Sequence, residues 1–171
     1  MVLFEDEFSL SNTATLHYNW AIKGKQPLVV SQQSKRERLT GLGSVNPLTG
    51  QLTVSFAERG NYQSFKKHLK KVLFAYTDAI SIIIYVDNVR YHHARKLNNF
   101  LEKHPKLQIR YLPAYSPDMN PVERVWWIMR KKITHNRYLS SLKERLIKFW
   151  QLFSACLKPN SFLSKLCVIT Y

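Results

Sequence analysis

The sequence predicts an α/β fold with one mixed central sheet flanked by helices and a C-terminal helical segment. Three observations carry this prediction. Short β-prone runs separated by turn residues fill the first third of the chain, residues 80–86 (ISIIIYV) are almost continuously apolar and β-branched, and apolar residues recur at helical spacing after residue 61. An unbroken run such as 80–86 is typical of a strand that is covered on both faces, which implies layers of helix on sheet.

The first part of the chain is expected to form strands. These lie at residues 2–8, 16–22, 27–30, 39–45 and 51–56. A Lys-Gly pair follows the second strand, and the Asn-Pro-Leu-Thr-Gly stretch at 46–50 favours a hairpin turn between the last two.

The remainder alternates helices and strands. A basic amphipathic helix is predicted over 61–76, because its apolar residues follow helical spacing and four lysines take the other face. We then expect a strand at 80–86, a helix at 92–103, a strand at 107–112 and a loop at 113–120. Asn120 opens the next helix with Pro121 at its first position, and helices continue through 139–157. We expect one domain over 1–138, with residues 139–171 as a helical extension packed on it.

Charge indicates a polyanionic partner. Lys and Arg number 26 against 11 Asp and Glu, which gives a net charge of +15 and exceeds what solubility alone requires. The longest uncharged apolar run is too short to span a bilayer, and the N-terminus lacks a basic region of the kind that begins a signal peptide. We therefore expect a cytoplasmic protein, associated with the nucleoid if it is bacterial, and two reduced thiols at Cys156 and Cys167.

Two aspartates stand out by position. Alternation along the first strand places Asp6 on the same face as Phe4 and Phe8, so its carboxylate needs a partner or a cation that Glu5 and Glu7 on the other face do not. Asp87 ends the buried strand, where ligands gather in open α/β sheets. The structural alternatives are a shifted register that leaves Asp6 in solvent and an Asp-Asn turn that stops the strand at Asp87.

A third acid, Glu123, lies three residues after Asn120, so it also fits the capping box of the helix. Two Asp at strand positions and a Glu on a later helix can nevertheless converge at one sheet edge. Such hard oxygen ligands suit Mg²⁺ or Mn²⁺.

Four motifs together resemble the DDE-type transposases of the mariner-like insertion-sequence superfamily. They are VLFEDE at 2–7, NWAIKGKQP at 19–27, VDN at 86–88 with His92 after it, and LPAYSPDMNPVERVWWIMRKKI at 112–133. The last is the most specific, and the resemblance extends to about Tyr138. It implies a ribonuclease H-like fold with Asp6, Asp87 and Glu123 as the catalytic and metal-binding triad, separated by 35 residues between the second and third acids.

The resemblance also implies a mechanism and partners. Two Mg²⁺ (or Mn²⁺) ions would clamp a scissile phosphate, so that the enzyme cleaves transposon ends and joins them to target DNA, at a TA dinucleotide in related elements. Members carry helix-turn-helix modules ahead of the catalytic domain, and these modules are absent from this sequence. We expect a homodimer, or an assembly with a separately encoded N-terminal half.

Further residues are candidates for DNA contact or support, each with a structural alternative such as a solvated face, a helix cap or the core. They are Asn88, His92, Tyr115, Arg124, Trp127, Arg130, Lys131 and Lys132.

Two competing hypotheses remain. One is a ribonuclease H-like nuclease without strand transfer, against which the long 112–133 match argues. The other is an inactive truncated fragment that binds DNA or full-length transposase, against which the presence of all three acids argues.

Overall fold

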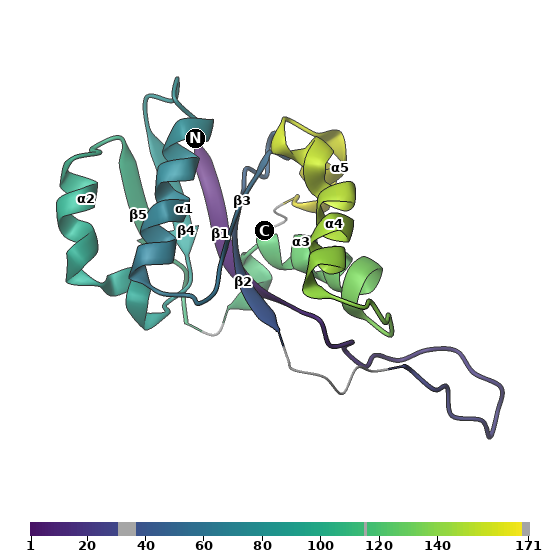
Figure 1. The fold of residues 1–171 in the computed structure, drawn as a ribbon. Helices are drawn as coiled ribbons and strands as arrows, with labels where there is room; N and C mark the ends of the chain where they lie inside the picture. The colour runs from purple at the N-terminus through teal and green to yellow at the C-terminus, as the bar shows by residue number, and fades with distance from the viewer. Residues whose placement is uncertain (31–36, 115, 169–171) are drawn as a thin grey trace.

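The computed structural model describes residues 1–30, 37–114 and 116–168. Its centre is a five-stranded sheet in the order β3-β2-β1-β4-β5 (Figure 1). The strands are β1 (Val2–Ser11), β2 (Arg38–Val45), β3 (Leu52–Ala57), β4 (Ile82–Val86) and β5 (Leu107–Tyr111). The pairs β1–β2 and β2–β3 are antiparallel, whereas β4 runs parallel to both β1 and β5. The predicted mixed sheet is therefore confirmed.

The hairpin between β2 and β3 follows from its turn residues. The Asn46 side chain accepts hydrogen bonds from the amides of Leu48 and Thr49, and the Gly50 amide donates to the Asn46 carbonyl. Gly50 has a φ of 70°, a left-handed conformation that glycine adopts without steric cost. The predicted turn at 46–50 is confirmed.

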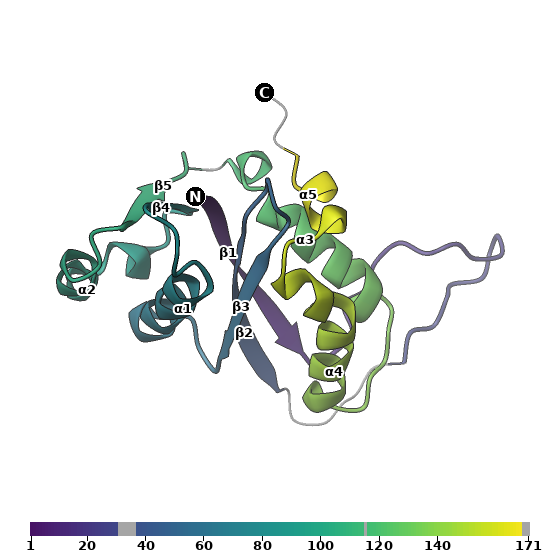
Figure 2. The same cartoon turned by 90° about the horizontal axis from the view of Figure 1, so that it is seen from above.

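Helices cover both faces of the sheet (Figure 2). On one side lie α1 (Tyr62–Ala75) and α2 (Asn98–Glu102), and on the other α3 (Val122–Met129), α4 (Leu142–Phe153) and α5 (Ser161–Leu166). Asn61 begins α1 by accepting hydrogen bonds from the amides of Gln63 and Ser64. The lysine-bearing helix expected over 61–76 is thus confirmed.

Two apolar clusters fill these two layers. Leu3 of β1 packs with Phe65, Leu69 and Val72 of α1, while Phe4 and Phe8 belong to the other cluster. The Phe8 ring stacks on Phe149 of α4 at a centroid distance of 5.3 Å. The C-terminal helices therefore share a core with β1, and the expected division of the chain at residue 138 stays a prediction.

The expected helix at 92–103 is wrong in its first half. Two 3₁₀ turns, Arg90–His93 and Arg95–Leu97, precede the short α2. Between them Ala94 is extended, with a φ of −63° and a ψ of 121°. The backbone turns there because His92 is drawn into the interior by contacts described below.

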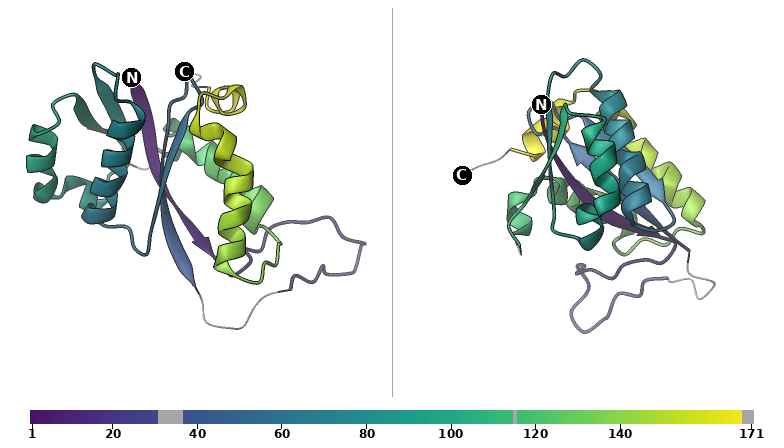
Figure 3. Two further views of the ribbon diagram at one scale, coloured as in Figure 1. Left: turned by 45° about the horizontal axis from the view of Figure 1, so that its top comes forward. Right: turned by 90° about the vertical axis from the view of Figure 1, so that its left-hand side faces the viewer.

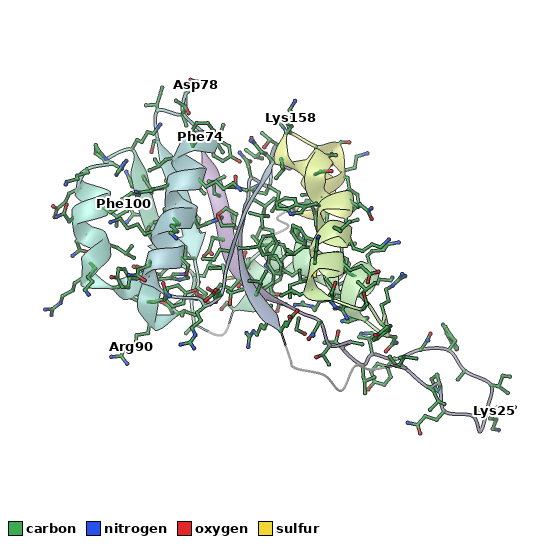
Figure 4. All side chains as sticks on the ribbon, viewed as in Figure 1. Lys25, Phe74, Asp78, Arg90, Phe100 and Lys158 are labelled. Atoms are coloured by element: carbon green, nitrogen blue, oxygen red, sulfur yellow. The ribbon has the colours of Figure 1, made fainter. Side chains whose placement is uncertain are left out.

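The strands expected at 16–22 and 27–30 do not form. Both edges of β1 are already paired, with β2 and β4, so no free strand edge remains beside it. Residues 13–30, here called the arm, instead project from the body of the molecule (Figures 3 and 4), with Lys25 at the far end. The predicted Lys-Gly turn is present, since Gly24 has a φ of 82° and the Lys25 amide donates to the Ile22 carbonyl.

In the described part of the chain, no helix has the length and apolar character needed to cross a membrane.

Candidate metal site at the carboxyl end of the central strands

Asp6 lies near the middle of β1, on the face that packs against α3. Its partner across the β1–β2 pair is Gly43, and a Cβ atom there would lie 2.4 Å from the Trp126 ring. The absent side chain of Gly43 therefore lets α3 approach the sheet beside Asp6. The predicted face of Asp6 is confirmed, and its side chain is half-buried.

Asp87 follows the last residue of β4 and lies beside Asp6. In the parallel β1–β4 pair, Phe4 is opposite Tyr85, so each strand brings its aspartate to the same level two residues later. The Val89 amide donates to Asp87 Oδ1 at 3.2 Å. The Asp-Asn turn considered as an alternative is thus present, and it holds the carboxylate at the sheet edge.

Glu123 is placed by the start of α3. Asn120 fixes this start to the sheet, because its Nδ2 donates to the Glu5 carbonyl at 3.0 Å and its Oδ1 accepts from the Val122 amide at 3.2 Å. The capping box that was the structural alternative for Glu123 forms only in its first half. The Glu123 carboxylate does not contact Asn120. It lies 3.5 Å from Nη2 of Arg130, seven residues later in the chain.

The three acids line one cavity of about 410 Å³, which also includes Asn88 and Asn120. Burial and the Glu123 carboxylate raise the pKa of Asp6 to about 8, with a smaller contribution from Asp87. Burial would raise the pKa of Asp87 too, but hydrogen bonds from His92 and Val89 lower it below its usual value. Asp6 therefore keeps its proton near neutral pH, and a cation that replaced this proton would relieve the repulsion among the acids.

The acids do not form a closed chelate as they stand. Among the residues that the structure describes, no three His, Cys, Asp or Glu side chains are close enough to hold a metal ion together. Two of the acids have partners within the protein, since Asp87 contacts His92 and Glu123 contacts Arg130.

His92 is a buried support for Asp87. Its Nδ1 lies 3.1 Å from both the carbonyl oxygen and Oδ1 of Asp87. Both atoms only accept hydrogen bonds, so Nδ1 carries the hydrogen. Phe65 of α1 packs on the imidazole ring at a centroid distance of 4.2 Å. The side chain is 3% exposed, so its contacts are with Asp87 and the interior of the protein.

Glu5 corrects the expectation for the other face of β1. The sequence pattern suggested that it needs no partner, yet it is 0% exposed and lies beneath α1. Its Oε2 faces Nε2 of His92 at 3.6 Å. Burial, followed by the charges of Asp6, Glu7 and Asp87, raises the pKa of Glu5 well above its usual range. A buried carboxyl thus stands directly behind the histidine that holds Asp87.

The other candidate residues have diverse surroundings. The side-chain amide Nδ2 of Asn88 donates to the Leu112 carbonyl at 2.6 Å and connects the ends of β4 and β5 beside the cavity. Arg124 donates to the carbonyls of Leu166 and Val168, which fastens the C-terminal segment to α3. Lys132 is exposed, and Tyr115 lies outside the described residues.

Trp127 and Lys131 project from the exposed side of the same helical region. Trp127 is 47% exposed, and the Lys131 ammonium lies 4.8 Å from the centroid of its ring.

Sequence reasoning missed the roles of Glu5 and Arg130. Arg130 lies seven residues after Glu123, two helical turns along one face, and this spacing was a usable signal for the pair. Glu5 offered no such signal, because only the packing of α1 makes its position buried.

Known proteins similar to this chain identify its family. Residues 1–146 match the family model described as DDE superfamily endonuclease. The uncharacterized 39 kDa protein of insertion element IS630 from Shigella sonnei is 30% identical over 147 residues, which cover 86% of this chain and 43% of that protein. The chain therefore spans less than half the length of this curated relative.

Solved structures share the fold. The Mos1 transposase paired-end complex with the left transposon end superposes with a TM-score of 0.71 at 15% identity, covering 97% of this chain and 51% of that one. The catalytic domain of Mos1 mariner transposase gives 0.58 at 15% identity, with 97% and 74% covered. The ribonuclease H-like fold is thereby confirmed. With a family model matched over most of its length, the chain belongs to the DDE superfamily endonucleases.

Proposed function

We propose that this chain is the catalytic domain of a transposase that cleaves DNA at the ends of an insertion element and joins those ends to target DNA. One observation carries the proposal: acids from three separate elements, Asp6, Asp87 and Glu123, line a single cavity at the carboxyl end of parallel strands. The relative from an insertion element and the Mos1 complex with a transposon end support this choice over a nuclease without strand transfer.

The donor set fits divalent metal ions. Carboxylate oxygens are the ligands that Mg²⁺ and Mn²⁺ prefer, and Mos1 paired-end complexes have been solved with each of these metals. We propose that Asp6, Asp87 and Glu123 hold two such ions. When bound, the ions would activate the attacking hydroxyl and stabilise the leaving oxygen. The chain itself fixes Asp87 through His92 and Val89 and delivers Glu123 from α3.

DNA is the proposed partner because of charge as well as family. The net charge of +15 favours a polyanion, and Lys131 and Lys132 extend from the helix that carries Glu123. Mos1 structures contain transposon DNA, which supports the same assignment. A TA target is proposed on the resemblance alone.

Substitution of Glu123 tests the proposal. Glu123→Gln keeps the size of the side chain and a hydrogen-bonding oxygen but removes the charge that a divalent ion requires. We expect Mn²⁺-dependent nicking of supercoiled DNA, and strand transfer with precut ends, to fall by more than about 100-fold, because even indirect metal supports cost 10–100-fold. The free energy of unfolding should change by less than about 1 kcal/mol, as expected for an exposed ion pair.

Glu102→Gln, on the last residue of α2, is the matched control and should retain full activity. Metal-dependent nicking that survives in Glu123→Gln, or a wild-type chain that nicks with neither metal, would contradict the proposal.

We also propose that the chain forms a homodimer through the arm. Several large apolar side chains of the arm are exposed, including Trp20 at 99%, and surfaces of this kind commonly mark protein contacts. Light scattering should give twice the monomer mass for the wild type, and a monomer after Trp20→Ser together with Leu28→Ser. A wild-type monomer at micromolar concentration would contradict this assignment.

A further inference from the structure

A second cavity, here called the arm pocket, lies where the arm leaves the body and meets the chain that follows α3. Its volume is about 440 Å³, and its lining includes His17, Trp127, Lys131, His135 and Arg137. None of these residues lines the cavity of the three acids. The arm pocket therefore needs an explanation of its own.

The arm pocket is built by specific contacts between two distant segments. The Thr15 amide donates to the Thr134 carbonyl at 3.1 Å, and the Asn136 amide donates back to the Thr15 carbonyl at 2.9 Å. The Asn136 side chain accepts from the His17 amide and donates to its carbonyl, at 2.9 and 2.8 Å. These bonds fix the root of the arm, although the rest of the arm projects outward.

Backbone irregularity marks the same place. Residues Arg130–Thr134 form a π-helical turn, and Asn136 has a φ of 51°, the only positive value at a non-glycine residue in the described chain. Both features cost conformational energy and concentrate at functional sites. Here they bring His135 and Arg137 round to face the arm.

The walls combine aromatic surface with positive charge. The rings of His17 and His135 stack at a centroid distance of 4.3 Å, and nearly half of the Trp127 side chain is exposed. Lys131 and Arg137 supply two cations. Planar rings beside cations are the features that hold the bases and phosphates of a nucleic-acid strand.

The position of the arm pocket relative to the acids is set by one helix. Glu123, Trp127 and Lys131 follow each other at intervals of four residues, so they form a stripe on one side of that helix. At about 1.5 Å of rise per residue, Trp127 lies about 6 Å and Lys131 about 12 Å beyond Glu123. One DNA strand advances about 3.4 Å per nucleotide, so the stripe spans about two to four nucleotides.

We infer that the arm pocket binds one nucleobase of the DNA strand that carries the scissile phosphate, about two to four nucleotides from that phosphate. The base stacks on Trp127, and its flanking phosphates lie against Lys131 and Arg137. This inference rests on the proposed function for the position of the phosphate. It adds a site that orients the strand independently of metal ions.

A double-mutant cycle between protein and DNA tests the inference without any cleavage step. The probes are tailed duplexes of random sequence in EDTA, each with one abasic position that is moved stepwise along the single-stranded tail. The proteins are the wild type, Trp127→Leu, and Phe162→Leu as a control, since Phe162 of α5 is equally exposed at 48% and does not line the arm pocket. Thermal unfolding of each variant checks that its fold is intact.

We expect Trp127→Leu to weaken binding of the intact probe roughly tenfold, the usual effect of losing one base stack. At a single abasic position that loss should vanish, because the base that stacks on Trp127 is already missing. Phe162→Leu should bind like the wild type throughout. An unchanged affinity of Trp127→Leu, or a loss of the same size at every abasic position, would overturn the inference.

Because the assay needs neither metal nor catalysis, its outcome is separate from that of the Glu123→Gln experiment. Suppose that the loss caused by Trp127→Leu vanishes at one abasic position while Glu123→Gln is still active. The arm pocket would then be supported as a base-binding site, and the three-acid mechanism would be contradicted.

Discussion

Two neighbouring carboxyl groups on β1, those of Glu5 and Asp6, lie on opposite faces of the sheet and differ in their access from solvent. Asp6 faces α3 and opens into a cavity with Asp87 and Glu123, whereas Glu5 is sealed beneath α1 against His92. Burial raises the pKa of both groups. They differ in access from solvent, since Asp6 lines a cavity and Glu5 is 0% exposed. We therefore expect a metal ion from solvent to reach Asp6 and not Glu5.

The two faces are nevertheless connected through Asp87. His92 reaches the carboxylate of Asp87 with Nδ1 and faces Glu5 with Nε2, so the closed side of the sheet holds an acid of the open side. This arrangement resembles the outer-shell partners that orient metal ligands in other proteins. We therefore expect the closed face to contribute rigidity and the open face to contribute the proposed metal ligands.

Asp6→Asn should give the largest effect on stability. The pKa of Asp6 is raised from 3.8 to about 8, so the folded chain retains a proton that the unfolded chain releases between these values. Wild-type stability should therefore fall as the pH rises from about 4 to about 8. Asn cannot ionise, so near pH 8 the variant should be more stable by on the order of 3 kcal/mol.

Denaturant unfolding of both proteins in EDTA at several pH values measures this difference. In a second series without EDTA, Mn²⁺ should stabilise the wild type and leave Asp6→Asn unchanged. Parallel pH profiles for the two proteins would show that the site carries no such charge repulsion.

Two substitutions of His92 should give a smaller effect and separate its hydrogen bond from its packing. Asn can place its amide nitrogen where Nδ1 lies and still donate to Asp87, whereas the longer Gln side chain reaches toward the position of Nε2. We expect Mn²⁺ affinity to drop 10–100-fold in His92→Gln and only a few-fold in His92→Asn. Calorimetry measures both affinities. Equal losses would mean that His92 serves only to fill space beside Phe65.

The sequence predicted the parts of the fold that depend on local pattern. Alternation along β1 placed Asp6 and Phe8 on one face, and the run at 80–86 predicted β4, which ends at Val86 immediately before Asp87. Turn and cap residues such as Asn46 and Asn120 marked element ends that the structure confirms. In each case the residues next to one another in the sequence determine which element forms and where it ends.

Features that depend on residues far apart in the sequence could not be predicted from local sequence pattern. The arm has the composition of strands, but the sheet has no free edge beside β1 to receive it. His92 leaves the helical path because Asp87 and Glu5 draw it inward. Glu123 prefers Arg130 to its own helix cap, a choice between two local partners that differ little in energy. The roles of the three acids as ligands stay a prediction.

A titration of Mn²⁺ into the wild type and Asp87→Asn by calorimetry tests the central claim most directly. Asp87 is the acid that the protein fixes most firmly, with hydrogen bonds from both Val89 and His92. We expect weak binding by the wild type, tighter binding once DNA is present because a phosphate completes the ligand shell, and little or no binding by Asp87→Asn. Equal Mn²⁺ affinity in the two proteins would contradict a metal site built from Asp6, Asp87 and Glu123.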